Sequence, residues 1–212
     1  EQYLQGLFYQ KCVIVEGSSD RYFYQEMFDK YNGTNDQDLG VVIAGGVGNS
    51  KHMIDIVAKV GLKAAFIYDL DVLISNHALI KQSYMTLSGT DENPLKELEE
   101  LFNSDLSIKN SSTDKDRIKA IESLTGYDRK TGFSNAWLKT NNSILKKIFR
   151  TLEAQGLFIV PNGELESWAP NVEDKVHFSE LAPAILASDK KLKKSFDRFA
   201  KKVLAHVEIV IS

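Results

Sequence analysis

The chain has 212 residues, the length of one large domain or of a compact domain with an insertion. It is 43% hydrophobic and 26% charged, and no apolar run reaches the roughly 18 residues of a membrane span, which excludes a transmembrane protein. The net charge of −3 argues against a protein that coats nucleic acid through its overall charge. Any contact with nucleic acid would have to come from a local basic patch. A single Cys12 favours a reducing, cytoplasmic setting. Because the sequence starts at Glu1 without Met or a signal-peptide pattern, we expect a domain of a longer protein.

The first 75 residues alternate between short apolar strands and amphipathic helices. Strands are expected at 11–15, 40–44 and 63–68. Helices are expected at 21–31, ended by Asn32 and Gly33, and at 50–60, with Ser50 as its N-cap. Nearly continuous apolar strands separated by helices predict a parallel sheet covered on both faces. The predicted fold class is therefore α/β, a Rossmann-like parallel sheet.

The chain becomes more polar from 72 to 156, which is too long for a simple crossover and predicts a helical insertion. Its expected helices are 94–102, 115–124 and 143–155. A fourth strand is expected at 156–160, followed by helices at 179–186 and 189–204, the latter with Leu192, Phe196, Phe199 and Val203 on one face. The predicted division is a catalytic core of 11–75 and 156–170, an insertion of 76–155 and a C-terminal helical extension of 171–212.

Acidic residues follow three of the four predicted strands. Glu16 follows the first strand, Asp69 and Asp71 follow the third, and Glu164 and Glu166 follow the fourth. Since the carboxyl ends of parallel strands lie at one edge, these carboxylates are expected to gather there. Asp20, at the start of the next helix, is either part of this group or only a helix cap. The simpler alternatives are a turn for Asp69 and Asp71 and a surface loop for Glu164 and Glu166.

A cluster of like charges is unfavourable unless cations neutralise it. Oxygen ligands of this kind suit Mg²⁺ or Mn²⁺, and two such ions can activate a water and stabilise the leaving oxygen of a phosphodiester. The predicted chemistry is therefore phosphoryl transfer or hydrolysis.

Two further features concern phosphate. The segment GGVGNSK is not a nucleotide-binding loop, because Ser50 stands where that motif needs Gly before Lys51. The glycines are expected instead to let a phosphate or metal approach. Lys51 and the tail-helix residues Lys190, Lys194 and Arg198 are candidate contacts to a DNA backbone, the alternative being a solvated helix face.

Three elements together resemble the TOPRIM domain of topoisomerases, bacterial primases and OLD-family (overcoming lysogenization defect) nucleases. They are VEGSSD at 15–20, the Gly45-Gly46 turn and DLD at 69–71. The segment GELESW at 163–168 is similar to the one that follows the fourth strand in OLD-type nucleases. The resemblance covers 11–75 and 156–168.

This resemblance implies a two-metal DNA endonuclease or nickase that serves in anti-phage defence or DNA repair. It also implies an ABC-type ATPase domain preceding it in the same chain, and homo-oligomers formed through that domain. By position, Glu16 would be a metal ligand or general base, Asp20, Asp69 and Asp71 metal ligands, and Glu166 a ligand of the second ion, with Glu164 a further candidate. OLD-type sites also use a Lys near the C-terminal end, for which Lys190, Lys191, Lys193 and Lys194 compete.

Two other functions remain open from the sequence. A primase-like domain would transfer nucleotides with the same metals. A non-catalytic interaction domain would keep the fold and bind one Mg²⁺ in its acidic pocket.

Overall fold

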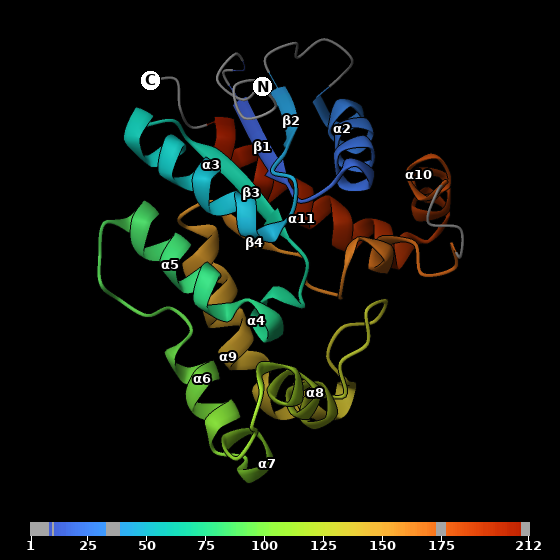
Figure 1. Ribbon diagram of the computed structural model, residues 1–212. Coiled ribbons are helices and arrows are strands. Elements are labelled where there is room, and N and C mark those ends of the chain that lie inside the picture. The colour runs from blue at the N-terminus through green and yellow to red at the C-terminus, as the bar shows by residue number, and fades with distance from the viewer. Residues whose placement is uncertain (1–8, 10, 33–38, 173–176, 209–212) are drawn as a thin grey trace.

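The computed structural model describes residue 9 and residues 11–32, 39–172 and 177–208 (Figure 1). Its centre is a four-stranded parallel sheet in the order β2-β1-β3-β4. The strands are β1 (Lys11–Val15), β2 (Leu39–Ile43), β3 (Ala64–Tyr68) and β4 (Leu157–Ile159). Val13 of β1 lies opposite Val41 of β2 and Ala65 of β3. The predicted α/β class with a parallel sheet is confirmed.

Helices cover both faces of the sheet, as the continuously apolar strands require. Cys12 and Ile14 point to the face covered by α3 (Val47–Val60), α5 (His77–Ser88) and α9 (Asn135–Glu153). Val13 and Val15 point to the face covered by α2 (Ser18–Asn32), α10 (Phe178–Ser188) and α11 (Lys190–Glu208). Each face thus has its own hydrophobic cluster, with the strands contributing alternate residues to the two.

The segment between β3 and β4 is helical, as predicted, but contains more helices than expected. In chain order they are α4 (Val72–Ser75), α5, α6 (Lys96–Asn103), α7 (Leu106–Lys109), α8 (Asp114–Thr125) and α9. The sequence did not predict α4, α5 or α7. It also placed the start of α9 too late, at residue 143. The helix begins at Asn135, and the side chain of Ser134, its N-cap, accepts a hydrogen bond from the amide of Trp137. Ile80, Leu98 and Ile148 pack in the same cluster as the sheet. The insertion therefore completes the core of one face, while the three-part division stays a prediction.

The start of α3 differs from the prediction. The helix begins at Val47 with Gly46 as its N-cap, and Gly46 has a φ of 105°. Ser50 is buried inside the first turn, where its hydroxyl donates to the Val47 carbonyl at 2.6 Å and accepts from the Tyr68 hydroxyl at 3.0 Å. The predicted N-cap at Ser50 is therefore wrong, because its side chain is used for packing against β3. α2 continues through Asn32, and Gly33 lies outside the described residues.

The apolar face predicted for the tail helix is confirmed in α11. Phe196, Phe199 and Val203 are buried, and Leu192 packs against the same cluster. In Figure 1, α11 runs along the sheet on the side of α2. Within the part of the chain that the structure describes, no helix combines the length and the apolar character that crossing a bilayer demands.

Candidate active site

The acids that follow the strands come together at the carboxyl edge of the sheet. Charge interactions link Glu16 with Asp20, Asp71 and Glu164, and link Asp20 with Glu166. Asp69 lies within the electrostatic field of four of the others. We call this group the acidic edge; its members are Glu16, Asp20, Asp69, Asp71, Glu164 and Glu166.

The backbone of Glu16 is held by the glycine turn that follows β2. Its carbonyl oxygen accepts the amide of Gly45 at 3.1 Å and the amide of Gly46 at 3.0 Å. Both glycines have positive φ, 81° and 105°, which favours residues without a Cβ. The turn was expected to admit a phosphate, but these two amides are already used to fix the end of β1. Its glycines therefore serve first to position Glu16.

Burial and mutual repulsion raise the pKa of several of these carboxyls. Burial, followed by the charges of Asp71 and Asp20, raises the pKa of Glu16 to about 7. The pKa of Asp20 rises to about 6, mainly through burial. Burial and the neighbouring acids hold the pKa of Asp69 well above its usual range, and the pKa of Asp71 is raised as well. An ionised acidic edge is therefore costly without a cation.

Asp20 has a local role as well as a place in the acidic edge. It is the third residue of α2, and its Oδ2 accepts the amide of Gly17 at 2.9 Å. This is the carboxylate half of a capping box, in which the third helical residue bonds back to the N-cap amide. The helix-cap alternative is thus realised, and the same carboxylate also lies within the fields of Glu16 and Glu166.

The exits of β3 and β4 are tied together by the backbone. β3 ends at Tyr68, and the amide of Leu70 donates to the carbonyl of Gly163 at 2.8 Å. Leu70 is buried, while Asp69 and Asp71 on either side of it both act on Glu16. The short turn before α4 therefore brings both aspartates to the acidic edge.

Sequence reasoning missed Arg129 and Tyr127, which bind Glu164. Arg129 Nε lies 2.6 Å from Oε1 and 2.7 Å from Oε2 of Glu164, and the Tyr127 hydroxyl is 3.3 Å from Oε1. Glu164 is only 4% exposed, so this pairing compensates its buried charge. Arg129 lies 35 residues earlier in the chain, in a turn without any periodic signal. The predicted metal-binding role of Glu164 stays a prediction, beside this observed ion pair.

The acidic edge has the donor chemistry of a metal site without a ready coordination shell. Across residue 9 and residues 11–32, 39–172 and 177–208, no three His, Cys, Asp or Glu side chains stand together in a group that could hold a metal ion. Its donors are all carboxylate oxygens, which suit Mg²⁺ or Mn²⁺. A bound ion would therefore require some of these side chains to turn towards it.

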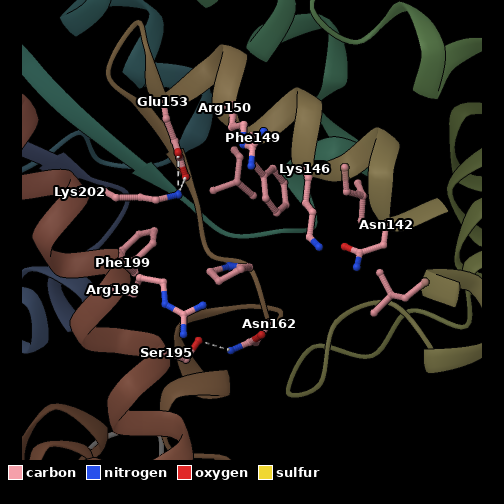
Figure 2. A pocket seen from close by; sticks show the side chains of 14 residues that line it. Asn142, Lys146, Phe149, Arg150, Glu153, Asn162, Ser195, Arg198, Phe199 and Lys202 are labelled. Atoms are coloured by element: carbon pink, nitrogen blue, oxygen red, sulfur yellow. Dashed lines mark hydrogen bonds and ion pairs between the residues drawn. The ribbon is translucent and has the colours of Figure 1, made fainter.

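The predicted DNA contacts lie in two places. Lys51 is exposed in α3, which follows the β2 exit, and Lys190 and Lys194 are exposed in α11. Arg198 of α11 lines a cavity between α9 and α11, shown in Figure 2. DNA binding by these four residues stays a prediction.

Residues 7–71 match the family model for the "Overcoming lysogenization defect protein-like, TOPRIM domain". This segment is similar to OLD-like TOPRIM domains. Two solved structures of the C-terminal region of the Xanthomonas campestris pv. campestris OLD protein, one phased with platinum and one with mercury, are similar to the chain. They are 10% and 11% identical to it with TM-scores of 0.43 and 0.42, and the similarity covers 97% of this chain and 86% and 87% of theirs. No curated protein matches the sequence.

The match confirms the resemblance that the sequence motifs indicated. The TOPRIM segment contains Glu16, Asp20, Asp69 and Asp71, while Glu164 and Glu166 lie beyond it. It also contains the Gly45-Gly46 turn that fixes Glu16. Four of the six acids of the acidic edge therefore lie within the matched segment.

Proposed function

We propose that the chain is a divalent-metal-dependent nuclease domain that hydrolyses phosphodiester bonds of DNA. One observation carries the proposal: the exits of β1, β3 and β4 and the start of α2 bring six carboxylates to one edge of an OLD-like TOPRIM segment. The raised pKa values of Glu16, Asp20 and Asp69 support it, since they indicate an environment that cations would stabilise.

Within this proposal the acids divide between two Mg²⁺ or Mn²⁺ ions. Asp20, Asp69 and Asp71 are ligands, Glu166 is a ligand of the second ion, and Glu16 binds an ion or accepts a proton from water. When bound, two such metal ions would lower the pKa of a water molecule and stabilise the leaving oxygen of the phosphodiester. The backbone of the chain positions these carboxylates. The glycine turn holds Glu16, and the hydrogen bond between Leu70 and Gly163 holds Asp69 and Asp71 beside the β4 exit. Glu164 contributes less, because Arg129 already binds both of its oxygens.

The wider setting rests on the family. We propose that the domain acts in the cytoplasm, that an ABC-type ATPase domain precedes it in a longer chain, and that homo-oligomers form through that ATPase domain. A role in anti-phage defence or DNA repair belongs to the same proposal. The buried, unpaired Cys12 is compatible with a reducing compartment.

The test is nicking of supercoiled plasmid in Mn²⁺ by the wild type and by the Glu16→Ala and Asp69→Ala variants. Glu92→Ala is the matched control, because Glu92 is an exposed acid outside the acidic edge. We expect cleavage by the wild type and the control, and a loss of at least about 100-fold in the two site variants, the size of effect that a catalytic group contributes.

Undiminished cleavage by both site variants would sink the proposal. Incorporation of labelled nucleotides without cleavage would replace it with primase-like nucleotidyl transfer. Calorimetric binding of a single Mg²⁺ without any reaction on nucleic acid would replace it with a non-catalytic interaction domain.

A further inference from the structure

A cavity of about 450 Å³ separates α9 from α11 and has the exit of β4 as its floor (Figure 2). A second cavity of about 390 Å³ shares Leu138, Pro161, Asn162 and Ser195 with the first and extends it towards Lys130 and Lys191. We call the two together the α9–α11 groove. Its floor residue Asn162 is followed directly by Gly163 and Glu164, so the groove lies beside the β4 exit that carries part of the acidic edge.

The groove is strongly basic in a chain of net charge −3. Lys146 and Arg150 come from α9, and Arg198 and Lys202 come from α11. The one acidic residue lining the first cavity is Glu153, which Lys202 binds at 2.8 Å, so four cations and one anion leave a formal charge of +3. The second cavity adds Lys130 and Lys191 and has no acidic lining residue.

Three of the four cations of the first cavity have no side-chain partner within the described part of the chain. No ion pair or side-chain hydrogen bond to a described residue joins Lys146, Arg150 or Arg198. Figure 2 shows Lys146 and Arg198 pointing from their two helices towards the space between them. Like charges that face one another across a groove repel, so an anion between them would be bound favourably.

The wall of the second cavity contains a buried hydroxyl, that of Ser167. Ser167 lines the second cavity and is only 1% exposed. Its Oγ has no hydrogen-bond partner among the described residues, although buried hydroxyls nearly always have one. Because the Oγ itself is buried beneath the cavity wall, a phosphate oxygen or a base would reach it only after that wall shifts.

We propose that the α9–α11 groove binds a single strand of nucleic acid and guides it to the acidic edge. The cations bind successive phosphates, with Arg150 and Arg198 able to form bidentate contacts. The half-buried ring of Phe149 lines the same cavity and offers a surface for a base, the combination that is typical of single-strand channels. Each cavity has the volume of a small-ligand pocket, so the groove accepts one strand and leaves a duplex at its rim.

This inference takes its substrate from the proposed function, but its test does not depend on cleavage. Fluorescence anisotropy in EDTA measures binding of a labelled oligothymidine of about 12 nucleotides, within the usual range of site sizes. The test variant is Arg150→Gln/Arg198→Gln. The matched control is Lys59→Gln/Lys109→Gln, which removes the same charge from exposed lysines that line neither cavity.

We expect the arginine variant to bind at least about tenfold more weakly, and the control to bind within about twofold of wild type. The salt dependence of binding should weaken as well. Each phosphate contact on a single strand contributes about 0.7 to the slope of log affinity against log salt concentration, so the loss of two contacts should reduce the slope by about 1.4. A duplex should bind more weakly than the single strand.

The inference is overturned if the arginine variant binds like wild type, if the control loses as much affinity, or if a duplex binds as tightly as a single strand. Should the thermal midpoint show that the arginine variant is unfolded, Lys146→Gln/Arg150→Gln provides the same measurement from α9 alone. If the wild type binds the strand as expected but does not cleave DNA in Mn²⁺, the proposed role of the groove is supported and the proposed nuclease activity is wrong. If the arginine variant still cleaves DNA and binds the strand like wild type, the proposed nuclease activity stands and the proposed role of the groove is wrong.

Discussion

At the scale of single residues, Glu16 carries a charge that its surroundings oppose. Burial and the charges of Asp71 and Asp20 raise its pKa to about 7. A carboxyl whose pKa is higher in the folded protein than in the unfolded chain stabilises the fold when it is protonated. That contribution is complete below the ordinary pKa, 4.5, and is lost as the pH rises through about 7. The metal-free protein is therefore expected to lose stability over this range.

Glu16→Gln should consequently stabilise the metal-free chain at pH 8, by about 1–3 kcal/mol or a few degrees in Tm. At pH 4.5 the two proteins should melt together, since Glu16 is then protonated in the wild type. Thermal unfolding in EDTA at both pH values measures the difference. Glu92→Gln, at an exposed position, should have little effect at either pH. A Glu16→Gln variant less stable than wild type at pH 8 would contradict this account of the acidic edge.

The sequence predicted the acids of this edge better than their partners. Asp69 and Asp71 were identified because they follow a buried strand, and the edge at which parallel strands end is fixed by the fold class. Arg129 could not be identified in this way, because it reaches Glu164 from a turn in the insertion. Asp20 received two alternative roles from the sequence, and the structure gives evidence for both.

At the scale of elements, the turn at 128–132 packs against the exit of β4. Gly163 has a φ of 135°, and a Cβ there would lie 2.3 Å from the carbonyl oxygen of Arg129. That carbonyl accepts the amide of Glu164 at 2.8 Å, while the carbonyl of Gly163 accepts the amide of Leu70. Gly163 therefore allows the insertion, the β3 exit and the β4 exit to meet at the acidic edge.

Gly163→Ala is expected to cost about 2–4 kcal/mol, because both the backbone conformation and the contact with Arg129 become strained. Gly48→Ala is the matched control: Gly48 lies in α3 with open space around it, so the same change should be neutral or stabilising by up to about 1 kcal/mol. Urea unfolding of both variants provides the two free energies. Equal stability of Gly163→Ala and wild type would show that the turn is not held in this way.

The elements themselves were predictable where their apolar pattern was strong. The four strands follow from short apolar runs and most helices from helical spacing, but α4 and α7 are each four residues long and too short to show a period. The capping side chain of Ser134 extends α9 upstream of its predicted start. The Ser50 error has a different cause, since a residue suited to an N-cap became a buried partner of Tyr68.

At the scale of the whole molecule, α11 completes the hydrophobic cluster on one face of the sheet. Phe196 and Phe199 pack against Trp168, with ring centroids 5.1 and 5.5 Å apart. Helical spacing predicted the apolar face of α11 but not the surface it would cover, because a periodic pattern carries no information about its partner. The segment predicted to be an extension is in this sense part of the core.

A chain that ends at Ser188 should therefore fail to unfold cooperatively, since the removal of α11 exposes one face of the sheet. Tryptophan fluorescence, to which Trp137 and the fully buried Trp168 both contribute, should shift towards that of an exposed indole already in the absence of urea. The control is Lys190→Ala in the full chain, which changes only an exposed side chain and should unfold like wild type. A truncated chain with a normal urea midpoint would mean that α11 is dispensable for folding.

The hydrogen bonds from Gly45 and Gly46 to Glu16 reach its backbone carbonyl and not its carboxylate. These two hydrogen bonds are thus independent of the side chain at position 16, whereas the carboxylate accepts a hydrogen bond from the backbone of Asp69. Exchanging Glu16 for another residue changes the chemistry offered at the edge and keeps the two glycine hydrogen bonds, whereas a side chain at Gly45 keeps the carboxylate and disturbs the turn that holds it. Two inactive variants at these neighbouring positions would therefore give the same assay result for opposite reasons, and a structure of each would tell them apart.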